Sequence, residues 1–184
     1  MAADPLVTAR WLPWDTARDA DWDAVYAAEL PRIYNYFRYR VGSPADAEDL
    51  TARTFEKAWR GRLRYRRDLA GFSTWLFAIA RHVAIDHFRA RRDELPLEAA
   101  VAVPSSSPTP EQDASLGEDA RRLARLLEKL PVRERELVAL KYGAGMTNRA
   151  IARATGLSES NVGTILQRTI ERLREGWNAG PAGE

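Results

Sequence analysis

The stretch GMTNRAIARATGLSESNVGTILQRTIERL, residues 145–173, decides the fold of the C-terminal part of this 184-residue chain. Met146-Thr147 and Leu157-Ser158 each place an apolar residue directly before a hydroxyl residue. A hydroxyl at the start of a helix accepts a hydrogen bond from a backbone N–H group two or three residues on. The two pairs therefore predict the starts of two consecutive helices.

Both predicted starts also have the pattern of a hydrophobic staple. Ile151 and Val162 follow the apolar residue of each pair by five positions, as the staple requires. We expect a supporting helix over 148–154 and a second helix over 159–174, with Gly156 in the turn between them. The pattern predicts a helix-turn-helix whose second helix reads DNA, and a plain helical hairpin is the alternative.

A segment without helical period separates this motif from the N-terminal half. Residues 94–115, ELPLEAAVAVPSSSPTPEQDAS, combine Pro, Ser and acids and predict a flexible acidic linker. After it, a helical stripe ends at Pro131 and a short helix runs to Tyr142. The stripe consists of Leu116, Ala120, Leu123, Leu127 and Leu130. The expected organisation is a tail over 1–20, a first domain over 21–93, the linker over 94–115, a second domain over 116–176 and a tail over 177–184.

The first domain shows three helical patterns. Pro31 interrupts the first pattern, so a kink or a restart of the helix is expected there. Ser43 and Pro44 provide an N-cap and a first-turn proline for the second helix. Asp68 is expected to cap the third. The three stripes are Trp22, Tyr26, Leu30, Ile33, Phe37 and Val41; then Ala47, Leu50, Thr54 and Ala58; then Phe72, Trp75, Leu76, Ile79, Ala80 and Val83. The sequence therefore predicts an all-α fold of two small helical domains joined by the linker.

Charge is segregated along the chain. The net charge is −4 over 1–50, +8 over 51–92, −7 over 93–120 and +5 over 121–184. Two basic blocks separated by an acidic one suggest two modules that bind a polyanion, although solvated helix faces would give the same pattern.

The composition disfavours several other classes of protein. The chain has no cysteine, so a disulfide framework or a cysteine zinc site is excluded. No stretch approaches the ~20 apolar residues of a membrane span, and we expect a cytoplasmic protein without membrane contact. His82 and His87 are five apart and do not have the spacing of a helical zinc pair. No catalytic constellation is found, and neither enzyme activity nor a cofactor nor a metal is expected.

A basic loop precedes the third helix. Cationic side chains that follow phosphates, next to aromatic rings that stack on bases, are typical of proteins that hold single strands. Phe72 and Trp75 lie on the periodic stripe and are interpreted as core residues, whereas Tyr65 lies off any stripe and is the better stacking candidate. The arginines around Tyr65 are Arg60, Arg62, Arg64, Arg66 and Arg67.

These motifs resemble the two conserved domains of extracytoplasmic-function (ECF) sigma factors. The resemblance covers residues 22–92 and 116–175. In the first domain it rests on PADAEDL (44–50), Phe55, Ala58-Trp59, FSTWL (72–76), Ile79-Ala80-Arg81 and Asp86. In the second it rests on Leu130-Pro131, Arg135, Leu140, Gly145-Met146-Thr147, Ile151-Ala152, Gly156, Ser158, Val162, Leu166, Arg168 and Leu173.

The resemblance implies a sigma2-like domain, a sigma4-like domain and a role in transcription initiation. The implied partners are promoter DNA and RNA polymerase core, through the beta-prime clamp helices and the beta flap, and an anti-sigma factor is a further possible partner. The implied contacts to polymerase are Asp46, Asp49, Ala52, Arg53 and Glu56. Those to the minus-10 element are Arg62, Arg64, Tyr65, Arg66, Arg67, Arg81, Arg89 and Arg92. Those to the minus-35 element are Ser160, Thr164, Gln167, Arg168 and Arg172.

The sequence also departs from the family pattern. Ala52-Arg53 stands where Gln-Glu is frequent, so a reversed charge must find another partner. Ala150 removes the capping-box partner of the preceding threonine. Gly163 and Ile165 stand where Lys and Arg are frequent, which predicts a weaker minus-35 contribution. A stand-alone helix-turn-helix regulator and a sigma-like decoy that binds polymerase without opening DNA remain alternatives.

Overall fold

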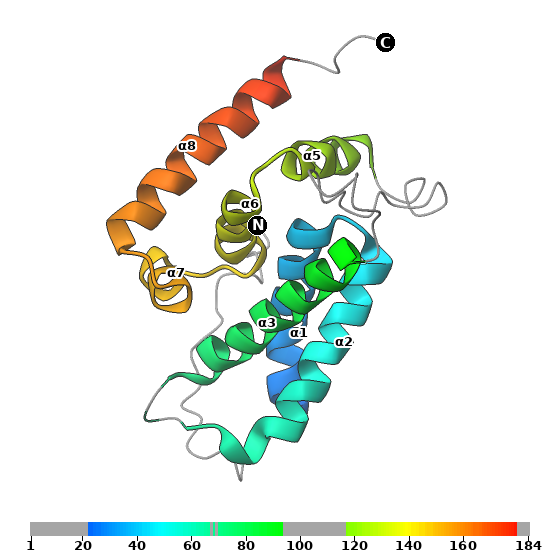
Figure 1. Cartoon of the computed structure of the whole chain (residues 1–184), viewed down its shortest axis with the longest axis vertical. Helices are drawn as coiled ribbons and strands as arrows, with labels where there is room; N and C mark the ends of the chain where they lie inside the picture. Colours follow the sequence, from blue (N-terminus) through cyan, green and yellow to red (C-terminus); the bar gives the residue numbers. More distant parts are fainter. Residues whose placement is uncertain (1–21, 67, 69, 94–116, 180–184) are drawn as a thin grey trace, which may run out of the picture.

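The computed structural model describes residues 22–66, 68, 70–93 and 117–179, and every regular element among them is a helix (Figure 1). The predicted linker, the first tail, Leu116 and Arg67 lie outside the described residues. The N-terminal region consists of α1 (Trp22–Val41), α2 (Pro44–Gly61), a short 3-10 turn η1 (Arg62–Arg64) and α3 (Phe72–Asp93). The C-terminal region consists of α5 (Glu118–Glu128), α6 (Val132–Val138), η3 (Ala139–Gly143), α7 (Asn148–Thr155) and α8 (Glu159–Asn178).

The N-terminal region is a three-helix bundle, and its second helix, α2, begins where the sequence predicts. The Ser43 hydroxyl accepts a hydrogen bond from the Asp46 backbone N–H at 3.3 Å, and Pro44 occupies the first turn. The predicted stripe of α2 is buried throughout. Helix α1 continues through Pro31, so the helix does not restart there. The largest fully buried side chains of the bundle are Ile33, Tyr36, Phe37, Leu50, Leu76 and Phe77.

The start of α3 differs from the prediction. Asp68 does not cap this helix, which begins at Phe72. The Asp68 carboxylate instead binds the Arg66 guanidinium, with a shortest N···O distance of 2.6 Å. The first helical hydrogen bond runs from the Trp75 N–H to the Gly71 carbonyl at 3.1 Å, so the loop extends through Gly71.

The helix-turn-helix is confirmed with its caps. Thr147 and Ser158 each accept a hydrogen bond at 3.2 Å from the backbone N–H three residues on. Gly156 has φ +75° at the end of α7, the left-handed conformation that suits glycine. Ile151 and Val162 are fully buried, as their staple positions predict. Helix α8 extends to Asn178, four residues beyond the predicted end.

The short helix before this motif ends in a π-helical turn that sequence periodicity did not predict. In η3 the Ala144 N–H donates to the Ala139 carbonyl at 2.9 Å, five residues back. Gly143 ends the turn and packs against the backbone of α1: a Cβ added there would lie 2.8 Å from the Asn35 carbonyl oxygen. Only glycine permits this close approach.

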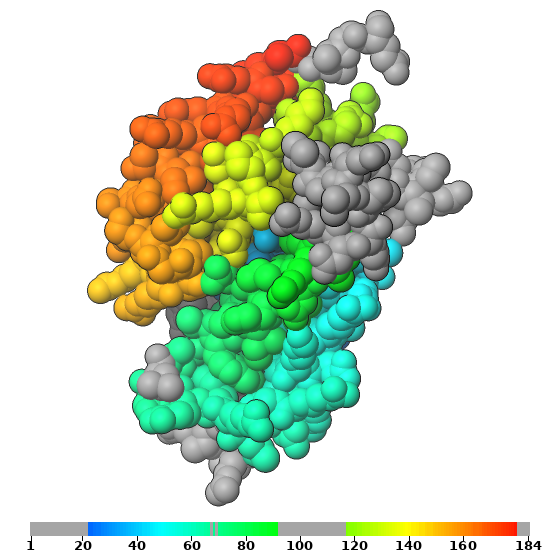
Figure 2. Space-filling model, in the orientation of Figure 1, coloured from blue at the N-terminus to red at the C-terminus, as the bar shows by residue number. Residues whose placement is uncertain are grey.

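The two regions pack directly against each other, which the sequence also did not predict. Helix α6 and the η3 turn lie against α1, and α7 lies against α3 (Figure 1). Figure 2 shows the C-terminal region seated on the N-terminal bundle. Buried apolar residues from both regions form one continuous core. None of the described helices is long and apolar enough to cross a membrane.

Candidate nucleic-acid interfaces

The arginines of the basic loop have different surroundings. The Arg62 guanidinium lies 3.9 Å from the centre of the Trp59 ring, and its Nη1 donates to the Trp59 carbonyl at 2.8 Å. Arg66 is paired with Asp68. Arg64 is exposed at the end of η1. Arg62 and Arg66 therefore shape the loop, and Arg64 is the better placed of the three to meet a phosphate.

Tyr65 is packed rather than projecting. Its ring centre lies 5.1 Å from that of Trp75 and 5.5 Å from that of Phe72. Its hydroxyl donates to the Ala70 carbonyl at 3.0 Å and spans the loop. Phe72 and Trp75 are half-buried and pack against the hydrophobic core, as their place on the periodic stripe predicts. The three rings form one cluster at the N-terminal end of α3, where they can support a stacked base together.

Sequence reasoning missed the continuation of this cluster onto α1 and α2. The Trp22 ring meets Trp59 edge-on at 5.2 Å and Phe72 at 5.8 Å. Trp59 is about half exposed, and Leu63 beside it is 75% exposed. We name the cluster of Trp22, Trp59, Tyr65, Phe72 and Trp75 the aromatic surface. Contacts between Trp22 and residues far along the chain leave no periodic signal, so no pattern could have indicated them.

The predicted minus-10 residues do not form a single patch. Arg81 points to the C-terminal region, where its Nε donates to a Glu136 carboxylate oxygen at 2.7 Å and its Nη1 donates to the Ala154 carbonyl. Arg89 is exposed on α3, and the rise of a helix places it roughly 25 Å from Phe72 along the axis. The Arg67 position and the Arg92 side chain lie outside the described residues.

Helix α8 presents most of the predicted minus-35 residues on its exposed side. Ser160, Thr164, Gln167, Arg168 and Arg172 are all exposed. Ser160, Thr164, Arg168 and Arg172 are four residues apart and Gln167 is three residues after Thr164, so all five lie on one side of the helix. Arg172 differs from the others, because its Nη1 lies 2.6 Å from a Glu134 carboxylate oxygen on α6.

The two unusual residues of α8 are half-buried rather than exposed. A Cβ added at Gly163 would lie 3.6 Å from the Asn148 side-chain nitrogen on α7. Ile165 packs against the hydrophobic core. Both residues therefore contribute to the packing of α8 within the domain.

The exposed face of α2 carries alternating charges. Arg53 forms an ion pair with Asp49 at 2.9 Å, so the cation that stands where the family often has Glu is paired within α2. Glu56 forms an ion pair with Arg60 at 2.6 Å. Ala52 is exposed between them.

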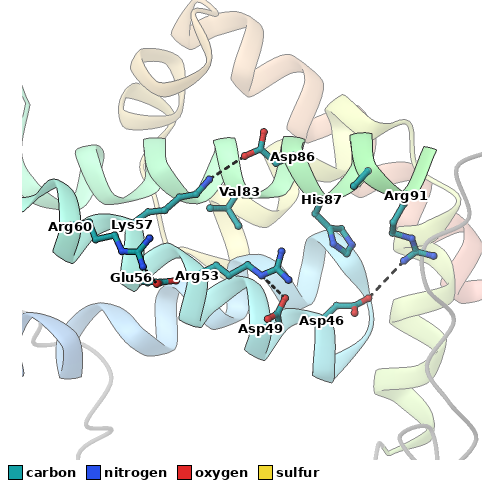
Figure 3. A pocket seen from close by; sticks show the side chains of 11 residues that line it. Asp46, Asp49, Arg53, Glu56, Lys57, Arg60, Val83, Asp86, His87 and Arg91 are labelled. Carbon is teal, nitrogen blue, oxygen red and sulfur yellow. Dashed lines mark hydrogen bonds and ion pairs between the residues drawn. The ribbon is translucent and has the colours of Figure 1, made fainter. Parts of the chain in front are cut away.

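A groove of about 910 Å³ lies between this face and α3 (Figure 3). Two ion pairs cross it: Asp46 to Arg91 at 3.7 Å and Lys57 to Asp86 at 3.1 Å. The His87 ring also lines the groove, and burial lowers the pKa of its imidazole. Its Nε2 is buried without a hydrogen-bond partner among the described residues. Within that same part of the chain, no cluster of three or more His, Cys, Asp or Glu residues could hold a metal ion. A groove lined by both signs of charge suits a protein surface better than a nucleic acid.

Comparisons with known proteins cover both regions. The chain matches the family described as Sigma-70 region 2 over residues 25–94 and that described as Sigma-70, region 4 over residues 120–173. It is 32% identical over 163 residues to the ECF RNA polymerase sigma factor BldN of Streptomyces coelicolor, a match that covers 85% of this chain and 61% of BldN. It is also 32% identical over 163 residues to the RNA polymerase sigma factor CarQ of Myxococcus xanthus, with 88% of this chain and 91% of CarQ covered.

A solved structure supports the fold. The sigma factor RpoE from Bartonella quintana, in its complex with the anti-sigma factor NepR, superposes with a TM-score of 0.70 and 23% identity, over 88% of this chain and 99% of that one. The chain spans less than two thirds of some relatives, including 61% of BldN and 63% of SigE from Mycolicibacterium smegmatis.

Proposed function

Because this chain belongs to the extracytoplasmic-function sigma factors of the sigma-70 family, we propose that it binds bacterial RNA polymerase core and directs it to specific promoters. The observation that carries the proposal is the presence of both matched regions in one chain, each with a surface suited to its task. The N-terminal region has an aromatic surface beside cations, and the C-terminal region has an exposed helix-turn-helix.

The two regions would contact DNA in different ways. The aromatic surface, with Arg64 at its edge, would hold the opened strand of the minus-10 element, because rings stack on unpaired bases while cations follow phosphates. The face of α8 with Thr164, Gln167 and Arg168 would enter the major groove at the minus-35 element. Glutamine suits adenine, and threonine suits a phosphate or a thymine methyl group.

Polymerase would bind the charged face of α2 and its groove. The proposed contacts to the beta-prime clamp helices are Asp46, Asp49, Ala52, Arg53 and Glu56, and the C-terminal region would meet the beta flap. An anti-sigma factor is a further proposed partner, since the structurally similar RpoE is held by NepR. The protein would act in the cytoplasm by binding rather than by catalysis.

Run-off transcription tests the proposal. Purified core polymerase is supplied with a library of genomic fragments, with and without this protein. We expect new transcripts that share a minus-10 motif. Stable binding to core without any transcript would instead support the decoy, and binding to DNA without binding to core would support the stand-alone regulator.

A further inference from the structure

A carboxylate lies beside the residues of α8 that are proposed to read DNA. Glu171 is exposed and follows Gln167 by four residues, so the two side chains lie one turn apart on the same side of the helix. The Gln167 Nε2 donates a hydrogen bond to a Glu171 carboxylate oxygen at 3.2 Å. Glu171 therefore contacts a proposed DNA-reading residue without belonging to that set itself.

The cations of α8 do not neutralise this carboxylate. Arg172 pairs instead with Glu134 on α6, at 2.6 Å. Within the described part of the chain Glu171 forms no ion pair, and Gln167 is its hydrogen-bond partner. The carboxylate thus lies uncompensated on a face proposed to meet a polyanion, where phosphates repel it. An acid here weakens binding to every DNA sequence alike, so any gain must come from discrimination between sequences.

The hydrogen bond fixes the direction in which the Gln167 amide faces. A carboxylate accepts and cannot donate, so the amide must turn its NH2 group toward Glu171. One of the two amide N–H groups is thereby occupied. The other N–H and the carbonyl oxygen Oε1 remain available for a base, so the paired side chain presents one donor beside one acceptor.

One donor beside one acceptor matches adenine in the major groove. Adenine presents the N7 acceptor and the N6 amino donor, whereas guanine presents two acceptors, N7 and O6. A glutamine with both N–H groups free can turn its amide nitrogen to guanine and donate twice. With one N–H held by Glu171, Gln167 satisfies adenine fully and guanine in part, and an acceptor left unsatisfied away from water is unfavourable.

We propose that Glu171 is a positioning residue that makes Gln167 prefer adenine to guanine in duplex DNA. It acts through Gln167 and needs no contact with a base. The inference rests on the proposed function, which assigns this face of α8 to the minus-35 element. Exclusion of water from the groove strengthens the bond between the amide and the carboxylate, so the constraint is firmest in the DNA complex.

Selection from a pool of duplexes tests the inference with the full chain alone. Duplexes that contain a randomised segment are captured by the immobilised protein and sequenced. We expect one position where adenine is preferred to guanine by roughly tenfold, and Gln167→Ala should abolish this preference. Glu171→Ala should reduce it to about twofold or less at that same position, because the freed amide can then donate twice to guanine. The other selected positions should not change.

Two further variants separate the contact from the charge. Glu175→Ala is the matched control, because Glu175 is an exposed acid of the same helix roughly two turns from Gln167. It should keep the adenine preference. Glu171→Gln removes the charge but keeps an oxygen that can accept from Gln167, so most of the preference should be retained. Each substitution removes one negative charge and should raise affinity for mixed-sequence duplex DNA to a similar degree.

Circular dichroism of each variant checks that the helices are retained. An unchanged adenine preference in Glu171→Ala, or an equal loss in Glu175→Ala, would overturn the role of Glu171. The role would also be overturned if Glu171→Ala altered the base preference of a chain that already carries Gln167→Ala, since the effect must pass through that side chain. A parent chain that selects no sequence would overturn it together with base reading by α8.

The selection uses no polymerase and is therefore decided separately from the run-off experiment. An adenine preference that depends on Glu171, in a protein that gives no transcript with core polymerase, would refute the proposed function alone. New transcripts with core polymerase, together with an adenine preference that is the same with and without the Glu171 carboxylate, would refute the role of Glu171 alone.

Discussion

Glu134 on α6 holds Arg172 on α8, with 2.6 Å between the carboxylate oxygen and Nη1. The same carboxylate accepts a hydrogen bond from the Thr169 hydroxyl at 3.1 Å. One acidic side chain therefore fixes two residues of the helix proposed to read the minus-35 element. It also neutralises one cation of that helix.

Replacement of the Glu134 carboxylate should slightly lower the stability of the protein and raise its affinity for DNA. Glu134→Gln is expected to lower the free energy of unfolding by no more than about 1 kcal/mol, because the Arg172 side chain is 54% exposed and solvent screens the pair. The released guanidinium should tighten binding to duplex DNA and steepen its salt dependence by about one unit. Urea unfolding and fluorescence anisotropy at several salt concentrations measure the two effects.

Arg168→Ala serves as the opposite control on the same helix, and it should weaken duplex binding and reduce the salt slope by about one unit. If Glu134→Gln weakened DNA binding as much as Arg168→Ala does, Glu134 would be needed for the shape of α8 and would not restrain its proposed binding to DNA.

Tyr65 should matter for promoter opening through its ring. Tyr65→Ala removes the contacts with Phe72 and Trp75 and is expected to reduce opening about tenfold, which is the scale of one lost base–aromatic stack. Tyr65→Phe keeps the ring and loses the hydrogen bond to the Ala70 carbonyl, and opening should stay within about twofold, since one neutral hydrogen bond contributes little net free energy. Permanganate reactivity of unpaired thymines, with core polymerase present, reports the opening.

Binding of the unopened promoter is the control for these two variants. It should change little in either, because the aromatic surface is proposed to act on unpaired bases. Equal losses of binding and opening in Tyr65→Ala would argue against a role in strand capture.

Gly156 should be intolerant of a side chain. With φ +75° at the end of α7, an alanine would adopt a left-handed conformation at a cost of roughly 1 kcal/mol or more. Thermal unfolding should show a lower Tm for Gly156→Ala, whereas Gly61→Ala, with φ −89° and an added Cβ at an ordinary 3.7 Å from the Trp75 ring, should leave Tm nearly unchanged. Equal Tm values for the two variants would show that the turn does not require glycine.

His87 should make stability depend on pH. Burial lowers the pKa of its imidazole below the usual 6.5, so the folded state disfavours the protonated ring. Its contribution to stability is therefore fully present above about pH 6.5 and is lost as the pH falls through the lowered pKa. Urea unfolding between pH 7.5 and pH 5 should show a smaller loss of stability in His87→Gln than in the parent. Parallel pH profiles would exclude His87 as the source.

Local patterns predicted the helices because their causes are local. The Ser43 cap, the buried stripe of α2 and the two staples each depend on residues within a few positions of one another, and all were confirmed. Asp68 shows the limit of this reasoning. Its side chain is of a type that often caps a helix, but its carboxylate binds the Arg66 guanidinium instead.

The sites were less predictable, since their neighbours come from distant parts of the chain. Arg81 matches a DNA-contacting position in the family pattern, but its partner Glu136 is 55 residues away. Trp22 contacts Trp59 because α1 and α2 pack together in the bundle, and the spacing of residues within one helix does not reveal such a contact. The close approach of Gly143 to α1 likewise depends on how the two regions pack together, and the hydrophobic periodicity within each region does not predict this packing.

The π-helical turn η3 also sets an angle. A π-turn holds about one residue more than an α-helical turn, and one residue corresponds to roughly 100° of rotation about the axis. The extra residue between Ala139 and Gly143 therefore fixes the azimuth of everything that follows, including the helix-turn-helix. A one-residue deletion there should turn the face of α8 that is proposed to read DNA away from its present direction. The number of residues in this turn therefore determines the orientation of the helix-turn-helix relative to the N-terminal bundle.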